Sequence, residues 1–324
     1  MPDQSALSCS ARSELVAEPL LGTAAYARAW VVLEQPGPWG RRALTQSHLD
    51  PELGAELDRR AAGADARVAL VRRPGRHADT QDPRSFRLWV AWTQPGQTWL
   101  LGGWITDPDR LRDLDWTALG AGDANAVAAS VPELSPDDDP LLLVCTNGRR
   151  DVCCALRGRQ LVDDVHDDLL GRVWESIHLG GHRFAPTALV LPHGTSHGRL
   201  TAELALEIMD GARRGLFVPA GYRGRTTYPK PAQAAEGAVR QHANTHGLDD
   251  LDVTTVDLAG DTWHVAVRHT DGRTWDVTVQ HVEHGTSRPE SCGANPEPVA
   301  TYQATDVTSP NEGAPPAARG WRHS

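Results

Sequence analysis

The stretch that says most about the fold is Leu141-Leu-Leu-Val-Cys145-Thr-Asn-Gly-Arg-Arg-Asp-Val-Cys153-Cys154. The apolar run 141–144 predicts a short buried strand, and a loop bearing cysteine side chains follows it. A helix is expected over Ala155–Leu170. The sequence therefore predicts a strand, a cysteine-bearing loop and a helix in direct succession.

More strands and a second helix are expected after this unit. They are predicted at Val173–Ile177, at Thr187–Leu191, as a short edge at Arg199-Leu200, and as a helix over Ala202–Ala212 that Thr201 caps. Strand, helix, two or three strands and helix is a thioredoxin-like order. Residues 140–230 are therefore predicted to form a thioredoxin-like domain of the α/β class.

The first 130 residues show the same coarse order, which predicts a preceding α/β domain related to the second. A strand is expected from Trp30, and a helix is expected after Asp50-Pro51, an N-cap residue followed by proline. Strands follow at Arg67–Val71, Phe86–Trp92 and Thr98–Ile105, and a further helix is expected to start over Pro108–Leu114. Between Gly120 and Pro140 the composition is typical of a linker.

The last hundred residues predict a smaller α+β segment at 231–301. A helix over Ala232–Thr245 precedes strands at Asp252–Leu258, Trp263–His269 and Arg273–Val282. From residue 302 to 324, the Pro, Gly, Ala and Ser content predicts a disordered tail.

Four side chains in two close pairs suit a soft or borderline metal: Cys145 and Cys154, then His178 and His182. Thiolates and imidazoles bind zinc and iron-sulfur clusters, whereas calcium and magnesium prefer oxygen. A single histidine is more often structural, but pairing with two cysteines favours ligation. Because Gly180-Gly181 would cost a helix about 1 kcal/mol each, a loop is expected between the histidines.

These motifs, together with Glu34-Gln-Pro-Gly-Pro-Trp-Gly-Arg41, resemble the sucrase/ferredoxin-like family, relatives of thioredoxin-like ferredoxins. The resemblance implies a two-iron two-sulfur (2Fe-2S) cluster held by two cysteines and two histidines. The family's eight-residue spacer selects Cys145 and Cys154, with Cys153 as the alternative to Cys154. It implies a one-electron carrier whose potential lies above that of a plant-type ferredoxin and depends on pH.

Two alternatives stay open. A structural zinc ion would use the same two cysteines and two histidines in a protein-interaction module. The motif Gly194-Thr-Ser196-His-Gly198 matches the nucleophile elbow of serine hydrolases, but Pro192 closes the preceding strand and the helix waits for Thr201, so a hairpin-like turn is expected instead. Glycoside hydrolysis needs two positioned carboxylates, and no spacing singles out such a pair.

The composition narrows the partners and the location. The formal net charge is −10 without a basic stripe, which argues against nucleic acid and anionic lipid. No apolar run approaches the roughly 20 residues of a membrane span, and the chain starts without a signal-peptide pattern, so a cytoplasmic protein is expected. Its five cysteines are expected to be ligands or free thiols, with Cys9 and Cys292 in the second class. With no G-x-G-x-x-G or P-loop, it should take its electrons from a separate redox protein or reductase.

Overall fold

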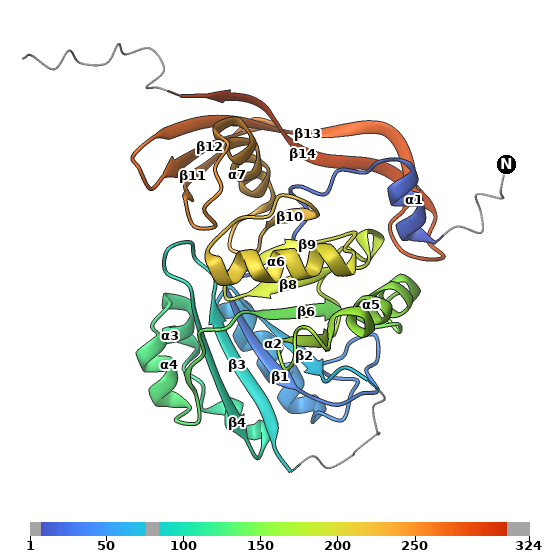
Figure 1. Cartoon of the computed structure of the whole chain (residues 1–324), viewed down its shortest axis with the longest axis vertical. Coiled ribbons are helices and arrows are strands. Elements are labelled where there is room, and N and C mark those ends of the chain that lie inside the picture. The colour runs from blue at the N-terminus through green and yellow to red at the C-terminus, as the bar shows by residue number, and fades with distance from the viewer. Residues whose placement is uncertain (1–7, 76–83, 310–324) are drawn as a thin grey trace, which may run out of the picture.

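The computed structural model describes residues 8–75 and 84–309, and within these ranges the strands form a ten-stranded mixed sheet and a four-stranded antiparallel sheet. Helices pack against both sheets (Figure 1). The α/β fold class expected from the sequence is confirmed.

The first half of the large sheet follows the predicted element order. It consists of β1 (Ala29–Glu34), α2 (Pro51–Gly63), β2 (Ala66–Arg72), β3 (Phe86–Trp92) and β4 (Trp99–Ile105), followed by the 3-10 helix η2 (Pro108–Arg112), α3 (Trp116–Ala121), α4 (Ala124–Ser130) and β5 (Ser135–Pro136). The Asp50 carboxylate accepts the backbone N–H groups of Glu52 and Leu53, so the predicted cap starts α2.

The second half repeats this arrangement. It consists of β6 (Leu141–Cys145), α5 (Val152–Val165), β7 (Val173–Ser176), the 3-10 helix η3 (His182–Phe184), β8 (Ala188–Leu191), β9 (Thr195–His197), α6 (Ala202–Arg214) and β10 (Tyr222–Arg225). In each half two parallel strands lie side by side, the third strand pairs antiparallel with the first, and the fourth pairs antiparallel with the third. The strand orders β2-β1-β3-β4 and β7-β6-β8-β9 are equivalent, and antiparallel pairing of β2 with β7 joins the halves.

Three local predictions within the large sheet were wrong. The segment predicted as a linker contains α4, which Asp123 caps and whose Val127 is buried, and β5, which pairs with β4. The predicted edge strand at 199–200 lies instead at β9, because Arg199 has a φ of +54° that ends extended pairing. Helix α5 begins at Val152 and ends at Val165, earlier than expected at both ends, since Asp151 accepts the N–H of Cys153 at 2.9 Å.

The C-terminal segment contains the predicted helix and strands. Helix α7 (Lys230–Ala243) packs on the sheet of β11 (Leu251–Ala259), β12 (Thr262–His269), β13 (Thr274–Pro289) and β14 (Pro296–Thr308), as Figure 1 shows. Strand β14 pairs with β13 up to Thr308, so the tail predicted from residue 302 begins too early. Residues 310–324 of that predicted tail lie outside the described residues. The domain boundaries themselves stay a prediction.

Strand β6 lies between two cores. Leu141, Leu143 and Cys145 face a core shared with the first half, whereas Leu142 and Val144 face the core beneath α5 and α6. Burial on both faces explains its unbroken apolar run. The short helix α1 (Cys9–Leu15) lies beside η3 and the far end of β13 (Figure 1). Within the described ranges, no helix is long and apolar enough to cross a membrane.

Candidate metal centre

Three of the four predicted ligands converge at the end of β6. Cys145 is the last residue of the strand, Cys154 lies on the first turn of α5, and His178 follows β7. One side-chain donor atom from each lies within 4.8 Å of the other two, and Cys145 Sγ is 3.9 Å from His178 Nδ1. Both cysteines are buried and His178 is half-buried. Parallel pairing of β6 with β7 aligns Cys145 with Ser176 and so brings the two loops together.

The fourth predicted ligand, His182, lies next to this group but outside it. Its ring centroid is 5.1 Å from that of His178. The His182 side chain is buried, and neither ring nitrogen makes a hydrogen bond, which is costly for a polar group without a partner. Its Nε2 is 3.7 Å from the Asp151 carboxylate. Burial lowers the pKa of His182 despite the opposing effect of Asp151, so the ring is neutral at pH 7 and can act as a metal ligand.

Two glycines shape the loop between the histidines, as the sequence predicted. Gly180 and Gly181 have φ angles of +94° and +74°, in the region that favours glycine. A Cβ on Gly181 would lie 2.2 Å from Nη2 of Arg223. A side chain at position 181 would therefore collide with Arg223 in the backbone conformation that the loop adopts.

The guanidinium of Arg223 contacts this loop and hydrogen-bonds to its backbone. It donates hydrogen bonds to the carbonyl oxygens of Gly180 at 3.0 Å and Thr23 at 2.6 Å, and to Ser196 Oγ at 3.3 Å. Burial and the charge of Arg183 lower its pKa to about 9, so it still carries a positive charge at neutral pH. A buried cation at this place favours thiolates at the neighbouring Cys145 and Cys154.

The thiols of Cys145 and Cys154 interact, and this interaction shifts their pKa values in opposite directions. The Cys154 thiol donates a hydrogen bond to the Cys145 sulfur, and this bond, together with His178, holds the pKa of Cys145 well below its usual range despite burial. The same pairing, with burial, raises the pKa of Cys154. This environment favours the thiolate form of Cys145, the form that binds metals.

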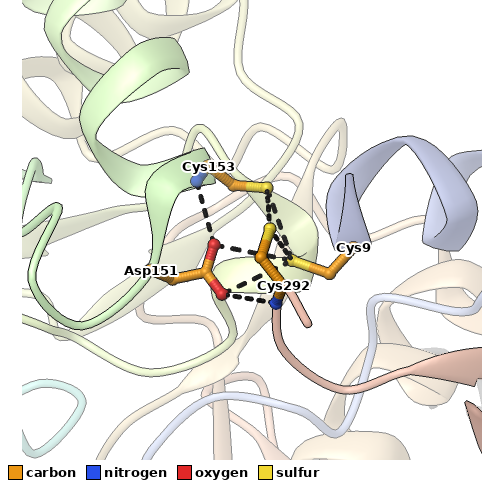
Figure 2. A group of neighbouring side chains, drawn as sticks. All are labelled: Cys9, Asp151, Cys153 and Cys292. Atoms are coloured by element: carbon orange, nitrogen blue, oxygen red, sulfur yellow. Dashed lines mark hydrogen bonds between the residues drawn. The ribbon is translucent and has the colours of Figure 1, made fainter. Parts of the chain in front are cut away.

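Adjacent cysteines on α5 point to different places. Cys154 lies with Cys145, whereas Cys153 lies with Cys9, Asp151 and Cys292 (Figure 2). None of the five cysteines forms a disulfide in this structure. The sequence analysis missed the gathering of Cys9 and Cys292 beside Cys153, because residues so far apart in the chain leave no spacing pattern.

Ser196 is not arranged as a nucleophile. It lies within β9, paired with Leu189 and Gly224, where an elbow would need a sharp turn into a helix. It is also buried, and its hydroxyl accepts the hydrogen bond from Arg223. The hairpin-like turn that the sequence predicted is present, because β8 and β9 pair antiparallel with Val190 opposite Thr195, and Ser196 lies on the second strand of that hairpin.

A cavity of about 710 Å³ lies beside His178. Its lining is strongly basic, with one carboxylate among the arginines: Arg41, Arg42, Arg59, Arg67, Arg150 and Asp58. His178 is the one of the four predicted ligands that reaches this lining. The cavity thus joins the candidate metal centre to a positively charged surface.

Comparison with known proteins identifies the family. A model of the sucrase/ferredoxin-like family matches residues 20–224, a range that includes all four predicted ligands. Searches of curated proteins and of solved structures each gave no match. The matched range covers more than half of the chain, and so the chain belongs to the sucrase/ferredoxin-like family.

Proposed function

We propose that this protein carries single electrons on a 2Fe-2S cluster held by Cys145 and Cys154 on one iron and by His178 and His182 on the other. The observation that carries the proposal is a buried pair of thiols beside a pair of imidazoles, of which His182 has two buried nitrogens without a hydrogen bond. A metal bond would satisfy one of those nitrogens.

The spread of the four side chains favours a two-iron core over a single ion. A tetrahedral zinc ion would draw all four ligands within about 4 Å of one another, given bond lengths of about 2.0–2.3 Å. Three of them fit this limit loosely, but His182 lies outside the 4.8 Å group. Two irons would tolerate the wider spacing of His182, and on binding the cluster His178 would move away from Cys145 because the two would ligate different irons. Structural zinc at Cys145, Cys154 and His178 remains the competing proposal, because those three atoms do converge.

When bound, such a cluster would accept and donate one electron at a potential above that of clusters with four thiolates. The chain would control that potential through its own charges. The buried guanidinium of Arg223 adds positive charge next to the thiolates, and the neutral imidazoles add none. Both effects favour the reduced form.

We further propose that the electron donor docks at the basic cavity beside His178. Electrons cross proteins most readily at the most exposed edge of a buried centre, and His178 is the least buried of the four predicted ligands. The surrounding arginines suit a partner with an acidic surface. Arg59→Glu should slow reduction by the dithionite anion at low salt, and the difference should vanish at high salt. An equal rate in both proteins at low salt would refute this docking site.

The test of the cluster is metal analysis of the full chain after anaerobic purification. We expect two irons and two acid-labile sulfides per chain and visible absorption that dithionite bleaches. Cys154→Ala should lose the iron, the acid-labile sulfide and the visible absorption, whereas Cys153→Ala should keep all of these. His178→Ala and His182→Ala should change the spectrum, and His166→Ala, at an exposed histidine, should not. Zinc without sulfide in the wild-type protein, lost on Cys154→Ala, would replace the proposal with the structural zinc site.

A further inference from the structure

A second group of potential ligands lies outside the centre just described. It consists of the thiols of Cys9, Cys153 and Cys292 and the carboxylate of Asp151, all within 4.8 Å of one another (Figure 2). Cys9 begins α1, Asp151 and Cys153 lie at the start of α5, and Cys292 lies between β13 and β14. Three separate parts of the chain therefore meet at this point.

The four side chains are spaced like the ligands of one tetrahedral ion. The sulfur of Cys153 is 3.4 Å from that of Cys9 and 3.3 Å from that of Cys292, and the third sulfur pair is 3.6 Å apart. With zinc–sulfur bonds of about 2.3 Å, a tetrahedron has sulfur–sulfur edges of about 3.8 Å and sulfur–oxygen edges of about 3.6 Å. Both Asp151 oxygens are 3.7 Å from the Cys9 sulfur.

A disulfide would account for less of this arrangement. It would join two of the three sulfurs and leave the third thiol and the carboxylate without a role. Here no pair is favoured, since the three sulfurs form a nearly equilateral triangle with the carboxylate beside it (Figure 2).

We propose that Cys9, Asp151, Cys153 and Cys292 bind a zinc ion. Three sulfurs and one oxygen are donors that zinc accepts, and calcium and magnesium would not choose thiolates. Neighbouring groups already hold the donors in place. Backbone N–H groups of Cys153 and Cys292 donate to the Asp151 carboxylate at 2.9 and 2.8 Å, and the Ser10 hydroxyl donates to the Cys153 sulfur at 3.3 Å.

The zinc ion would act as a clasp between distant segments. Cys9 and Cys292 are separated by 283 positions, and each meets Cys153 across at least 139. The ion would fix α1 and the turn between β13 and β14 to the start of α5, the same helical turn that carries Cys154. Because structural zinc contributes its binding free energy to folding, removal of the zinc should release α1 and the turn between β13 and β14 from α5 before the rest of the fold unfolds.

Zinc content of the full chain, expressed with zinc supplied and purified under reducing conditions, tests the clasp. We expect one zinc per chain that survives Cys154→Ala and is lost in Cys292→Ala, at a surface cysteine, and in Cys9→Ala. The zinc affinity of these two variants, measured by chelator competition, should be more than about 100-fold lower than that of the wild type. Loss of a residue that only hydrogen-bonds to a metal ligand already lowers metal affinity by about 10- to 100-fold. The iron and sulfide contents of Cys292→Ala should match those of the wild type. This result separates the zinc clasp from the 2Fe-2S cluster proposed at Cys145 and Cys154.

Two results would overturn the clasp. One is equal zinc content in the wild type and in the Cys292→Ala and Cys9→Ala variants, both checked for native circular dichroism. The other is a disulfide between Cys153 and either Cys9 or Cys292 in freshly purified protein, detected by mass spectrometry without reductant. A protein with all three thiols protected from alkylation until a chelator is added would support the clasp independently.

Discussion

Glu18 should be one of the most destabilising positions to neutralise in this protein. Its carboxylate is buried and accepts hydrogen bonds from Arg183 at 2.8 Å and from Arg288 at 2.7 and 2.6 Å. Arg183 follows the predicted ligand His182, and Arg288 lies near the end of β13. One carboxylate thus forms ion pairs with two guanidinium groups from separate parts of the chain.

The expected loss follows from the charges. At an effective dielectric constant of about 20, two opposite charges 4 Å apart attract by about 4 kcal/mol, so two guanidinium groups give about 8 kcal/mol before the cost of desolvation. Removal of one partner from a buried ion pair costs about 3–5 kcal/mol in practice. Glu18→Gln should therefore lower the free energy of unfolding by about 3–5 kcal/mol, a large part of a typical total of about 5–15 kcal/mol.

Urea unfolding at pH 7 measures the effect, with Asp210→Asn as the matched control. Asp210 pairs with Arg214 at 3.1 Å on the surface, where such pairs contribute about 1 kcal/mol or less. If Glu18→Gln cost no more than Asp210→Asn, the reasoning about the buried pair would be refuted.

The pH dependence gives a second check. Burial raises the pKa of Glu18, but Arg288 and Arg183 outweigh it, so its pKa in the folded protein lies below the usual value. A carboxyl group with a depressed pKa contributes its full stability above the unfolded pKa of about 4.3 and loses it as the pH falls through the folded pKa. The difference between wild type and Glu18→Gln should be constant from pH 7 to about 5 and shrink below that. A difference that grew on acidification would have the wrong sign.

Three further changes test other parts of the structure. Gly181→Ala should lower the free energy of unfolding in urea by about 2–4 kcal/mol, because the new Cβ clashes with Arg223 and alanine disfavours the left-handed backbone conformation. Gly180→Ala, whose Cβ would make only ordinary contacts, should lower it by about 1–2 kcal/mol. Equal losses in the two variants would contradict this explanation. Asp50→Ala removes the cap of α2 and should cost about 1 kcal/mol by the same measurement, with no change in iron content. A fluorophosphonate probe should not label the wild-type protein, and labelling that Ser196→Ala abolishes would restore the hydrolase interpretation.

Much of the fold could be predicted from local patterns. Apolar runs such as the one before Cys145 identified the central strands, and Asp50-Pro51 identified the start of a helix, because these signals depend on neighbouring residues alone. The region of α4 was missed because its alanines and capping Asp123 resemble a linker in composition, and only the burial of Val127 shows that it packs. Composition cannot report burial against distant segments.

The choice between Cys153 and Cys154 depended on where α5 begins. With a helix starting at Ala155, both cysteines lie in a loop and either could reach Cys145. The helix in fact starts at Val152, and adjacent residues on a helix point about 100° apart. One of the two must then face the core beside Cys145 and the other must face elsewhere. Asp151 as a cap was the available signal, since it sets the first helical residue.

The two candidate metal sites differ in how they relate to the family. Cys145, Cys154, His178 and His182 all lie inside residues 20–224, the range that the family model matches. The proposed clasp instead takes two of its thiols from outside that range, one from each side.

The segments outside the family range nevertheless reach the candidate metal centre. Asp151 accepts the N–H of Cys292 and lies 3.7 Å from His182, and Glu18 joins Arg183 to Arg288. The end of β13 and the turn after it are thus linked to the loop of His182 and Arg183 through Glu18 and Asp151. If the clasp holds zinc, removal of the zinc should displace Asp151 and, with it, His182, whereas Cys145 is fixed within β6. The positions of the two histidine ligands should therefore change before those of the two cysteine ligands.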